Sequence, residues 1–487
     1  MLYIGVDLGT SAVKLLLMDG KGHILNTVSE TYPVSFPQSG WSEQNPENWY
    51  IKSIVGIAKL IKDFDGQQIA GISFGGQMHG LTALDSDGVV IRPAILWNDG
   101  RSSHESDYLN NVIGKKKLSE YTGNISFAGF TAPKVLWMKR NEPDNYEKIS
   151  KILLPKDYLA YRMSGVFATD VSDASGTLYF DCRRRRWSDE MCEIVGIKKE
   201  WLPKVYESCE TIGNILPELA EQLNINKSCR IVAGAGDNAA AAIGTGTIGN
   251  GECNISLGTS GTIFISSDEF RTDENNSLHS FDHADGGYHL MGCMLSAASC
   301  NKWWVEDILK ATNFKAEQSE IKQLGNNKVF FLPYLMGERS PKNNPDCRAM
   351  FIGMSMDTVR EDMTQAVLEG VAFGLRDSFE AAAKMGVKIT RSSICGGGAK
   401  SRLWCEIVSN VLNIELLQTE NDEGPALGGA ILAAVSCGEY KSVKAACDAI
   451  VKKQVTVRPD PLLVSRYNDR YMEFSKLYPM CMEAGLW

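Results

Sequence analysis

The sequence predicts an α/β protein built from two lobes. Three observations predict this fold class: the length of 487 residues, a series of β-prone runs that end in glycine-rich loops, and a motif that recurs half a chain later. The chain is roughly three to four times as long as a typical single domain. We therefore expect two lobes, residues 1–245 and residues 246–487.

The composition excludes several classes of protein. Hydrophobic residues make up 44% and charged residues 22% of the chain, which is typical of a globular protein with large cores. The net charge of −9 has the wrong sign for a protein whose main partner is a nucleic acid or an anionic membrane, so we expect neither. The thirteen cysteines lack any C-x-x-C pair and the amino terminus lacks a basic leader, which indicates reduced thiols in a cytoplasmic protein.

The first half opens with a hairpin and continues with a helix and a strand. Two apolar runs, residues 2–6 and 13–18, flank the turn Asp7-Leu8-Gly9-Thr10-Ser11. Asn45-Pro46 then precedes a helical apolar stripe, because Asn caps helices and proline suits their first turn. The next apolar run, residues 69–74, predicts a strand that ends in the loop GGQMHG. A further strand at 91–96 leads to Trp97-Asn98-Asp99-Gly100-Arg101, and the pattern from there to about residue 230 leaves the topology open.

The chain then repeats its own beginning. A strand at 231–233 leads into GAGDNAAAAIG, in which Asp237 begins an alanine-rich helix. The motif Leu8-Gly9-Thr10-Ser11 recurs as Leu257-Gly258-Thr259-Ser260, again between two apolar runs. Four matching residues carry little weight alone, but the hairpin context and the half-length spacing favour a duplicated lobe.

The second half supplies a strand, a glycine turn and a helix in succession. A long helix is expected at residues 361–385, ended by Gly386. A strand around Ile394 then runs into Gly396-Gly397-Gly398-Ala399-Lys400-Ser401, before a helix at 403–412. Such a corner favours anions because it presents free backbone N–H groups and the positive end of a helix dipole. It is suited to part of a nucleotide.

The glycine-rich turns narrow the chemistry. No P-loop string occurs, and the G-x-G-x-x-G string at 244–249 follows a helix and opens none, so we interpret it as a linker between the lobes. Two hairpin turns of Gly, Thr and Ser facing each other across a cleft would grip a polyphosphate through backbone N–H groups and hydroxyls. Asp7 would then suit Mg²⁺, and Lys14 would add a charge. Either turn alone is equally consistent with an ordinary tight hairpin.

At this point the sequence resembles the FGGY carbohydrate kinase family. The strings GVDLGTSAVK, GISFGGQMHG, ILWNDGR, GDNAA, SLGTSG, FLPYLMGERSP and GGGAKS stand in the family's order and at similar spacings, from about residue 3 to residue 433. The resemblance implies an actin-like, ribonuclease H-like fold, in which two lobes enclose a cleft for ATP and sugar.

The resemblance also implies roles for individual residues. Asp237 corresponds to the catalytic base, and Asp7, with Asp237, to the residues near the metal. The implied sugar contacts are Met78, His79, Trp97, Asp99, Asn238 and Asp237 itself. The implied nucleotide contacts are Gly9, Thr10, Ser11, Lys14, Gly258, Thr259, Gly397, Gly398 and Ala399.

The implied reaction is transfer of a phosphoryl group from ATP, with Mg²⁺, to a pentulose. QMHG and WNDGR are the forms found in family members that act on D-xylulose, whereas related glycerol kinases have an Arg-Glu pair in place of Met78-His79. Phosphorylation of another ketose or polyol, such as ribulose, ribitol or gluconate, is the alternative, and a sugar-independent actin-like ATPase is a second. Lobe closure is expected to exclude water, with residues 244–251 as the hinge. Dimers are common in the family, so a homodimer is one expected assembly.

Asp237, His79 and the loop that contains Asp99 each have a simpler interpretation. Asp237 would also serve as the amino-terminal cap of its helix. His79 would also serve as a hydrogen-bonded structural histidine. Asn98, Asp99 and Arg101 would also form a turn with a local ion pair.

Overall fold

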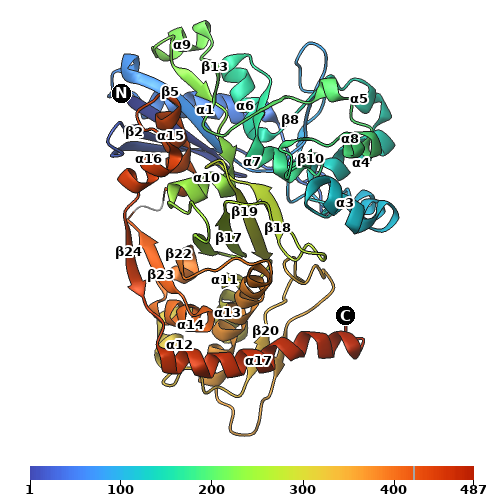
Figure 1. The fold of residues 1–487 in the computed structure, drawn as a ribbon, viewed down its shortest axis with the longest axis vertical. Helices are drawn as coiled ribbons and strands as arrows, with labels where there is room; N and C mark the ends of the chain where they lie inside the picture. The colour runs from blue at the N-terminus through green and yellow to red at the C-terminus, as the bar shows by residue number, and fades with distance from the viewer. Residues whose placement is uncertain (421–422) are drawn as a thin grey trace.

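Each half of the chain builds its own mixed sheet of seven strands. The structure is a computed structural model that describes residues 1–420 and 423–487. The two sheets lie in two lobes along the long axis of the molecule (Figure 1). The first sheet contains β1 (Leu2–Leu8), β2 (Ala12–Asp19), β3 (Ile24–Thr31), β5 (Ile69–Gly76), β13 (Thr211–Asn214), β14 (Arg230–Val232) and β15 (Ala235–Gly236). The second contains β16 (Cys253–Leu257), β17 (Gly261–Ser267), β18 (His279–Asp282), β19 (Tyr288–Met294), β22 (Arg391–Cys395), β23 (Glu415–Thr419) and β24 (Lys453–Val457).

The cores of the two sheets have the same topology. In the first, β3, β2 and β1 are antiparallel neighbours, and β5 and β14 continue the sheet parallel to β1. In the second, β19, β17 and β16 are antiparallel neighbours, and β22 and β23 continue parallel to β16. The two Leu-Gly-Thr-Ser motifs occupy equivalent hairpin turns, β1–β2 and β16–β17. The predicted duplication is therefore confirmed.

The first sheet is covered on both faces because its strands alternate their buried side chains. Ile4 and Val6 of β1 pack in one core with α1 (Pro46–Leu60), α6 (Pro155–Ser164) and α9 (Pro217–Leu223). Tyr3 of the same strand faces a second core with α10 (Asp237–Gly244), α15 (Gly424–Ser436) and α16 (Val443–Ile450). Helix α1 begins as expected, with the Asn45 side chain accepting a hydrogen bond from the Glu47 N–H.

The helices α15 and α16 come from the second half of the chain but pack on the sheet of the first. Figure 1 shows both, in red, beside β2 and β5. The approach is close enough to need glycine: a Cβ on Gly5 would lie 1.8 Å from the Ala426 carbonyl oxygen, and one on Gly428 would lie 1.9 Å from that of Ala240. The strands before residue 245 thus belong to the first sheet and those after it to the second. Helix α15, however, returns to the first lobe.

The second sheet is backed by three helices. These are α13 (Arg360–Lys384), α14 (Arg402–Leu412) and α17 (Pro461–Glu483), which share one large core with it. Helix α13 lies within one residue of its predicted bounds, and Gly386 has a positive φ of 82° just beyond it. The lobe also contains α11 (Ala298–Lys302), α12 (Phe314–Ser319), β20 (Phe330–Leu332), β21 (Met350–Ile352) and the 3-10 turn η6 (Gly397–Lys400).

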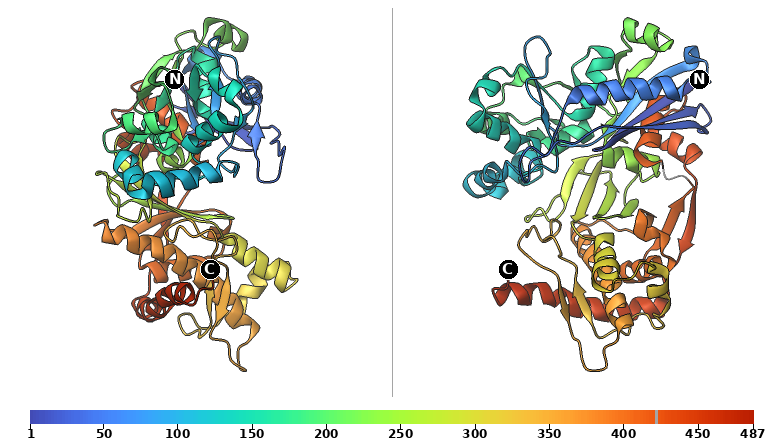
Figure 2. Two further views of the ribbon diagram at one scale, coloured as in Figure 1. Left: turned by 90° about the vertical axis from the view of Figure 1, so that its right-hand side faces the viewer. Right: turned by 180° about the vertical axis from the view of Figure 1, so that it is seen from behind.

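The segment that the sequence pattern left open forms an extension of the first lobe, with its own core. Residues Phe281 and Met291 of the second sheet belong to the same core, so the two lobes meet here as well as at α10 (Figure 2). The predicted strand at 91–96 is shorter, because only β7 (Ala94–Ile95) pairs there. The other elements are β4 (Glu43–Gln44), β6 (Thr82–Leu84), α2 (Ser103–Tyr108), α3 (Lys115–Thr122), α4 (Thr131–Asn141), α5 (Pro143–Glu147), β8 (Lys151–Leu153), β9 (Ala168–Asp170), α7 (Val171–Ala174), η3 (Ser175–Thr177), β10 (Phe180–Asp181), β11 (Arg186–Trp187), α8 (Asp189–Val195) and β12 (Lys204–Tyr206).

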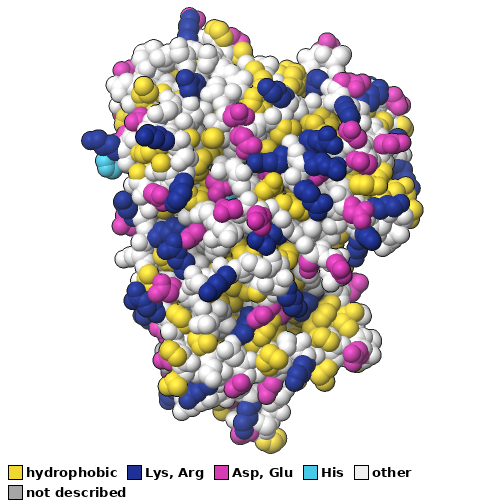
Figure 3. Space-filling view, in the orientation of Figure 1, with side chains coloured by type: hydrophobic (Ala, Val, Ile, Leu, Met, Phe, Trp, Pro, Cys, Tyr) yellow, Lys and Arg dark blue, Asp and Glu magenta, His cyan; other side chains and the backbone are white. Residues whose placement is uncertain are grey.

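Two compositional expectations concern the whole molecule. All thirteen cysteines belong to the described part of the chain, nine of them buried and four half-buried. Within residues 1–420 and 423–487, no helix is both long and apolar enough to span a membrane. On the face seen in Figure 3, basic and acidic side chains are interspersed and do not gather by sign.

Candidate active site

Asp7 and Asp237 lie at the carboxyl ends of neighbouring strands. Asp7 is in β1 and pairs with Gly75 of β5, whereas Gly236 of β15 pairs with Gly76 on the other side of β5. Asp237 follows Gly236 directly and is the first residue of α10. Because β1, β5 and β15 are parallel, both carboxylates reach the same edge of the sheet, where α/β proteins bind ligands.

The two carboxylates influence each other's charge. Burial raises the pKa of Asp237 to about 6. Burial first, and then the nearby charge of Asp237, raise the pKa of Asp7 to about 7. Lys14, the cross-strand partner of Asp7, opposes this rise but is itself paired with Glu423 at 2.6 Å, just before α15. A buried pair of like charges of this kind is typical of a cation site or of acid–base chemistry.

Asp237 is not the cap of its helix. Gly236 occupies the cap position. The Asp237 carboxylate instead accepts hydrogen bonds from the backbone N–H of Asn238 at 2.7 Å and from its Nδ2 at 3.0 Å. The capping interpretation is therefore wrong, and the carboxylate keeps its second oxygen, Oδ2, outside these two bonds.

Met78 packs against the peptide that carries Asp237, and His79 follows it in the chain. A Cβ on Gly236 would lie 2.9 Å from Met78 Sδ, and Asn238 Nδ2 lies 4.0 Å from the same sulfur. His79 has a positive φ of 68°, and its Nδ1 is 2.7 Å from the carbonyl oxygen of Gly176. Its ring stacks on Phe130 with the centroids 4.6 Å apart. The structure thus brings the predicted sugar contacts Met78, His79 and Asn238 together around Asp237.

The surroundings of His79 determine the charge state of its imidazole. Burial, and then the Arg339 guanidinium, lower the pKa of His79 to about 3. The imidazole is therefore neutral near pH 7 and is suited to hydrogen bonding, not to carrying charge.

The first hairpin turn is held open by side chains from the rest of the lobe. Gln44 Nε2 donates to the Thr10 carbonyl oxygen at 2.6 Å, and Tyr32 Oη to that of Gly9 at 2.5 Å. Trp97, expected among the sugar contacts, donates from Nε1 to Thr10 Oγ1 at 3.0 Å and is 44% exposed. Ser11 at the tip is exposed. The carbonyl oxygens of Gly9 and Thr10 are therefore occupied, and the Gly9 N–H donates to the Ala12 carbonyl oxygen at 3.0 Å across the turn.

Asp99 is fully engaged in a local ion pair. Its Oδ1 accepts from Arg101 N and Nε, and its Oδ2 accepts from Arg101 Nη2 and from the Ser42 N–H. Both side chains are wholly buried. The geometry therefore agrees with a turn stabilised by its own ion pair, and it gives no support to direct sugar contact by Asp99, because no carboxylate oxygen is left for a ligand.

In the second lobe, the hairpin turn and the glycine turn are adjacent. Ser256 of β16 pairs with Cys395 of β22, so the residues after them meet. A Cβ on Gly396 would lie 3.0 Å from the Gly258 nitrogen. The Thr259 carbonyl oxygen accepts hydrogen bonds from Ala297 N and from Ser299. Thr259 is exposed. The predicted nucleotide residues Gly258, Thr259, Gly397, Gly398 and Ala399 thus form one corner.

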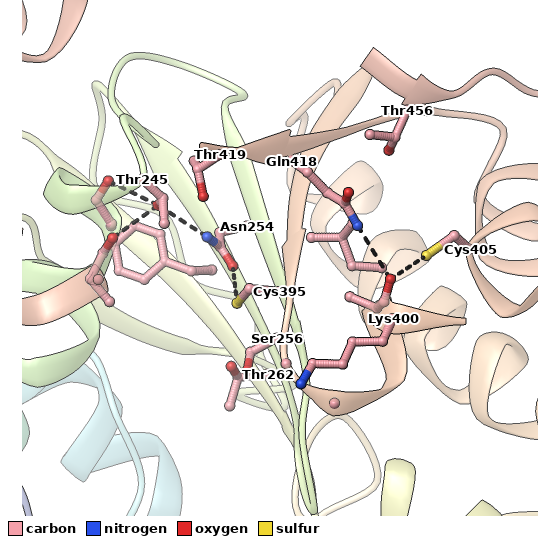
Figure 4. A pocket seen from close by; sticks show the side chains of 18 of the residues that line it. Thr245, Asn254, Ser256, Thr262, Cys395, Lys400, Cys405, Gln418, Thr419 and Thr456 are labelled. Atoms are coloured by element: carbon pink, nitrogen blue, oxygen red, sulfur yellow. Dashed lines mark hydrogen bonds between the residues drawn. The ribbon is translucent and has the colours of Figure 1, made fainter. Parts of the chain in front are cut away.

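A cavity of about 1040 Å³ joins this corner to the first lobe. Asn238 on α10 lines it from one lobe, and Gly397 and Ala399 line it from the other. Figure 4 shows Lys400 extending toward Ser256 and Thr262 at its wall. A second cavity, of about 760 Å³, lies on the other side of Gly397–Lys400. Among the residues that line this second cavity are Ala298, Asn301, Phe314, Gln318, Ile321 and Leu403.

Sequence reasoning missed several polar residues of the cleft. Gln44 and Gln77 are buried and bonded to each other at 3.1 Å beneath the first turn. Asn254, Gln418 and Thr419 line the large cavity from the second sheet. Gln77 follows β5 directly in the loop GGQMHG, and its place beside a glycine pair carried a signal. The others lie in strands with ordinary alternation and carried none.

Comparisons with known proteins agree with this geometry. Residues 2–244 match the N-terminal domain, and residues 253–437 the C-terminal domain, of the FGGY family of carbohydrate kinases. The xylulose kinase of Escherichia coli strain K12 is 39% identical over 481 residues, which cover 98% of each chain. A crystal structure of a xyloylose kinase from Brucella ovis, 38% identical, superposes with a TM-score of 0.94 over 99% of this chain and 100% of that one. A gluconate kinase from Lactobacillus acidophilus, 26% identical, also gives 0.94, over 99% and 98%.

The similarity thus extends over both lobes and over nearly the full length of the relatives. The expected fold, two lobes each built on a mixed sheet, is confirmed. The chain belongs to the FGGY family and is a carbohydrate kinase.

Proposed function

We propose that the protein transfers the terminal phosphoryl group of ATP to O5 of D-xylulose, with Asp237 as the general base. One observation carries the assignment of the base: Asp237 is a carboxylate with a raised pKa, and its neighbours in the chain contact Met78 and line a cavity shared by both lobes. The substrate assignment is supported by similarity to xylulose kinases over 98% of the chain.

The sugar-binding lobe would be built on residues 1–245, and the nucleotide-binding lobe on residues 246–487, with α15 and α16 packed on the first sheet. Met78, His79 and Asn238 would hold the sugar beside Asp237, with Trp97 at the edge of the site. His79 would do so as a neutral imidazole, since its pKa is about 3. A sugar hydroxyl needs hydrogen-bond partners in fixed positions, and the buried peptide of residues 78–79 supplies them.

Kinases of this family use ATP, and the corner at Gly397–Ala399 is suited to it. The second cavity has apolar walls from Phe314, Ile321 and Leu403, which suit a flat purine ring. The buried Asn301 Oδ1 has no hydrogen-bond partner within the described residues and would accept from the amino group of adenine. The phosphates would then lie between the two turns, in contact with Gly9, Thr10, Ser11 and Lys14 on one side and with Gly258 and Thr259 on the other.

Asp7 and Asp237 fit a Mg²⁺ ion that arrives with the nucleotide. Two carboxylates with raised pKa values repel each other, and a divalent cation with most of its water shell relieves that repulsion. When bound, Mg²⁺ supplies positive charge that stabilises the phosphoryl group in the transition state. The residues of the chain do the rest: the turns orient the phosphates, and the sugar site aligns O5.

Asp237 would accept the proton of the O5 hydroxyl as that oxygen attacks the phosphorus. The contribution of such a base is typically about 10² to 10⁴ in rate. Water would compete for ATP, so closure of the lobes must complete the site only around sugar. Residues 244–251, at the end of α10 and before β16, remain the proposed hinge, and they contain Gly246, Gly249 and Gly251 with positive φ.

A sugar panel with coupled detection of ADP tests the proposal. D-xylulose should be turned over with the highest kcat/KM, and the product should carry its phosphate on O5. Faster turnover of ribulose, ribitol or gluconate would replace the substrate assignment. ADP release that ignores every sugar would instead show a sugar-independent ATPase.

A further inference from the structure

A buried ionic cluster lies directly behind Asp237 and has no part in the proposed mechanism. At its centre, Lys156 Nζ lies 2.6 Å from Asp157, 2.9 Å from Asp170 and 3.7 Å from Asp173. All four side chains are at most 1% exposed. Burial of such a cluster is costly unless its charges are compensated, and here the Lys156 ammonium group faces the carboxylates of all three aspartates.

A chain of hydrogen bonds connects this cluster to the peptide before Asp237. Ser172 Oγ donates to Asp170 Oδ2 at 2.6 Å, and the same hydroxyl oxygen accepts from the backbone N–H of Gly236 at 3.1 Å. Asp170 is fixed in turn by Lys156, by the Ser172 N–H at 2.9 Å and by Ser208 Oγ at 2.7 Å. Gly236 has no side chain of its own to fix its orientation. Ser172 therefore restrains the residue from which Asp237 extends.

Lys156 restrains the same strand end a second time. Its Nζ donates to the Ala233 carbonyl oxygen at 3.3 Å, three residues before Gly236. Its Cβ also packs on β5, since a Cβ on Gly76 would lie 2.6 Å from it. Gly76 is the residue that pairs with Gly236. The cluster thus holds both strands at the point where the candidate base leaves the sheet.

The segment around Ser172 reaches the other parts of the site as well. The Gly176 carbonyl oxygen lies 2.7 Å from His79 Nδ1. Ser175 Oγ donates to Asp282 of the second lobe at 2.9 Å. One short stretch, residues 170–176, therefore contacts the base-bearing peptide, a sugar residue and the opposite lobe.

We propose that Ser172, held by Asp170 and Lys156, is a positioning residue that aligns Asp237 with the acceptor hydroxyl. The inference rests on the proposed function of Asp237 as a base. Proton transfer requires hydrogen-bond geometry between base and hydroxyl, and small displacements of a reacting group reduce the rate steeply. Release of the Gly236 N–H from Ser172 frees the peptide at the base of the Asp237 side chain.

The chain offers a matched control. Ser172 and Ser208 are both buried, and both donate to the same oxygen of Asp170, but only Ser172 binds Gly236. Ser172→Ala should lower the thermal midpoint more than Ser208→Ala, because it also leaves the buried Gly236 N–H without its partner. Only Ser172→Ala should lower kcat for the sugar, by about tenfold, the effect of one hydrogen bond of about 1.4 kcal/mol. KM for ATP should be unchanged in both. Ser172→Cys, nearly isosteric, keeps the site filled and should fall between Ser172→Ala and the wild type.

Each outcome decides the inference. Equal kcat for the two alanine variants, or a loss expressed only in KM, would overturn it and would leave Ser172 as a structural residue. If Ser172→Ala does not fold, the kcat of Ser172→Cys decides: a wild-type value refutes the positioning role. The wild-type assay separates this inference from the proposed function, because a wild type without sugar phosphorylation refutes the function itself.

Discussion

Replacement of Asp237 by asparagine separates its chemistry from its effect on stability. Burial raises its pKa from 3.8 to about 6, so above pH 6 the folded protein carries a charge that the unfolded chain carries more favourably. A raised carboxyl pKa destabilises the folded state as the pH rises from 3.8 to 6. At about 1.4 kcal/mol per unit, the cost at pH 8 is about 3 kcal/mol. Because the residue is partly exposed, about 2 kcal/mol is a reasonable lower figure.

Asp237→Asn removes this cost and the base together. The variant should be about 2–3 kcal/mol more stable than the wild type at pH 8 and equally stable at about pH 2.5, which is well below both pKa values, so that the wild-type carboxyl is protonated in both states. For a lobe of this size, that gain corresponds to about 6 °C in the thermal midpoint. Its kcat should fall by about 10² to 10⁴.

Scanning calorimetry at the two pH values and a coupled ADP assay measure both effects. Asp63→Asn, at an exposed position after α1, is the control and should change neither stability nor rate. More than a tenth of the wild-type kcat in Asp237→Asn would refute the base role. A loss of stability at pH 8 would refute the electrostatic reasoning even if the activity were lost.

Three further predictions test other parts of the site. The rate of sugar phosphorylation should fall below about pH 6, where Asp237 takes up a proton. His79 should cause no further fall between pH 5 and 8, because its pKa is about 3. A pH–rate profile that stays flat from pH 5 to 8 would contradict the prediction. Lys14→Gln breaks the ion pair with Glu423 and should raise KM for ATP about tenfold, while KM for the sugar stays unchanged. Initial-rate kinetics measure both constants, with the sugar saturating when ATP is varied. A change in KM for the sugar alone would disprove a role of Lys14 in phosphate binding. Gly428→Ala places a Cβ 1.9 Å from the Ala240 carbonyl oxygen and should lower the free energy of unfolding in urea by at least about 3 kcal/mol. Gly424→Ala is the control and should lower it little, because its Cβ would meet only a methyl group at 3.9 Å. Equal urea midpoints for the two variants would show that α10 and α15 separate easily.

The sequence by itself determined the local elements and the residues that carry chemistry. The β1–β2 and β16–β17 hairpins, helix α1 after Asn45 and helix α13 up to Gly386 follow from apolar periodicity, caps and turn residues. These are short-range effects that a stretch of chain exhibits wherever it lies. Asp7 and the glycine turns were found in the same way, because residues at strand ends stand out against apolar runs, whereas the role expected of Asp237 came from the family resemblance.

Only the tertiary structure decided how these pieces meet. Nothing local in α15 indicates that it returns to the first sheet, because its fit against Gly5 depends on a backbone more than 400 positions away. The roles of Asp99 and Ser172 likewise depend on contacts with distant segments. Asp99 was expected to be a sugar contact, but Arg101 and Ser42 occupy both of its oxygens. Ser172 lies in the segment whose topology the sequence pattern left open, and only the fold sets it against Gly236. Burial and long-range hydrogen bonds assign such roles, and both arise only when distant segments pack together.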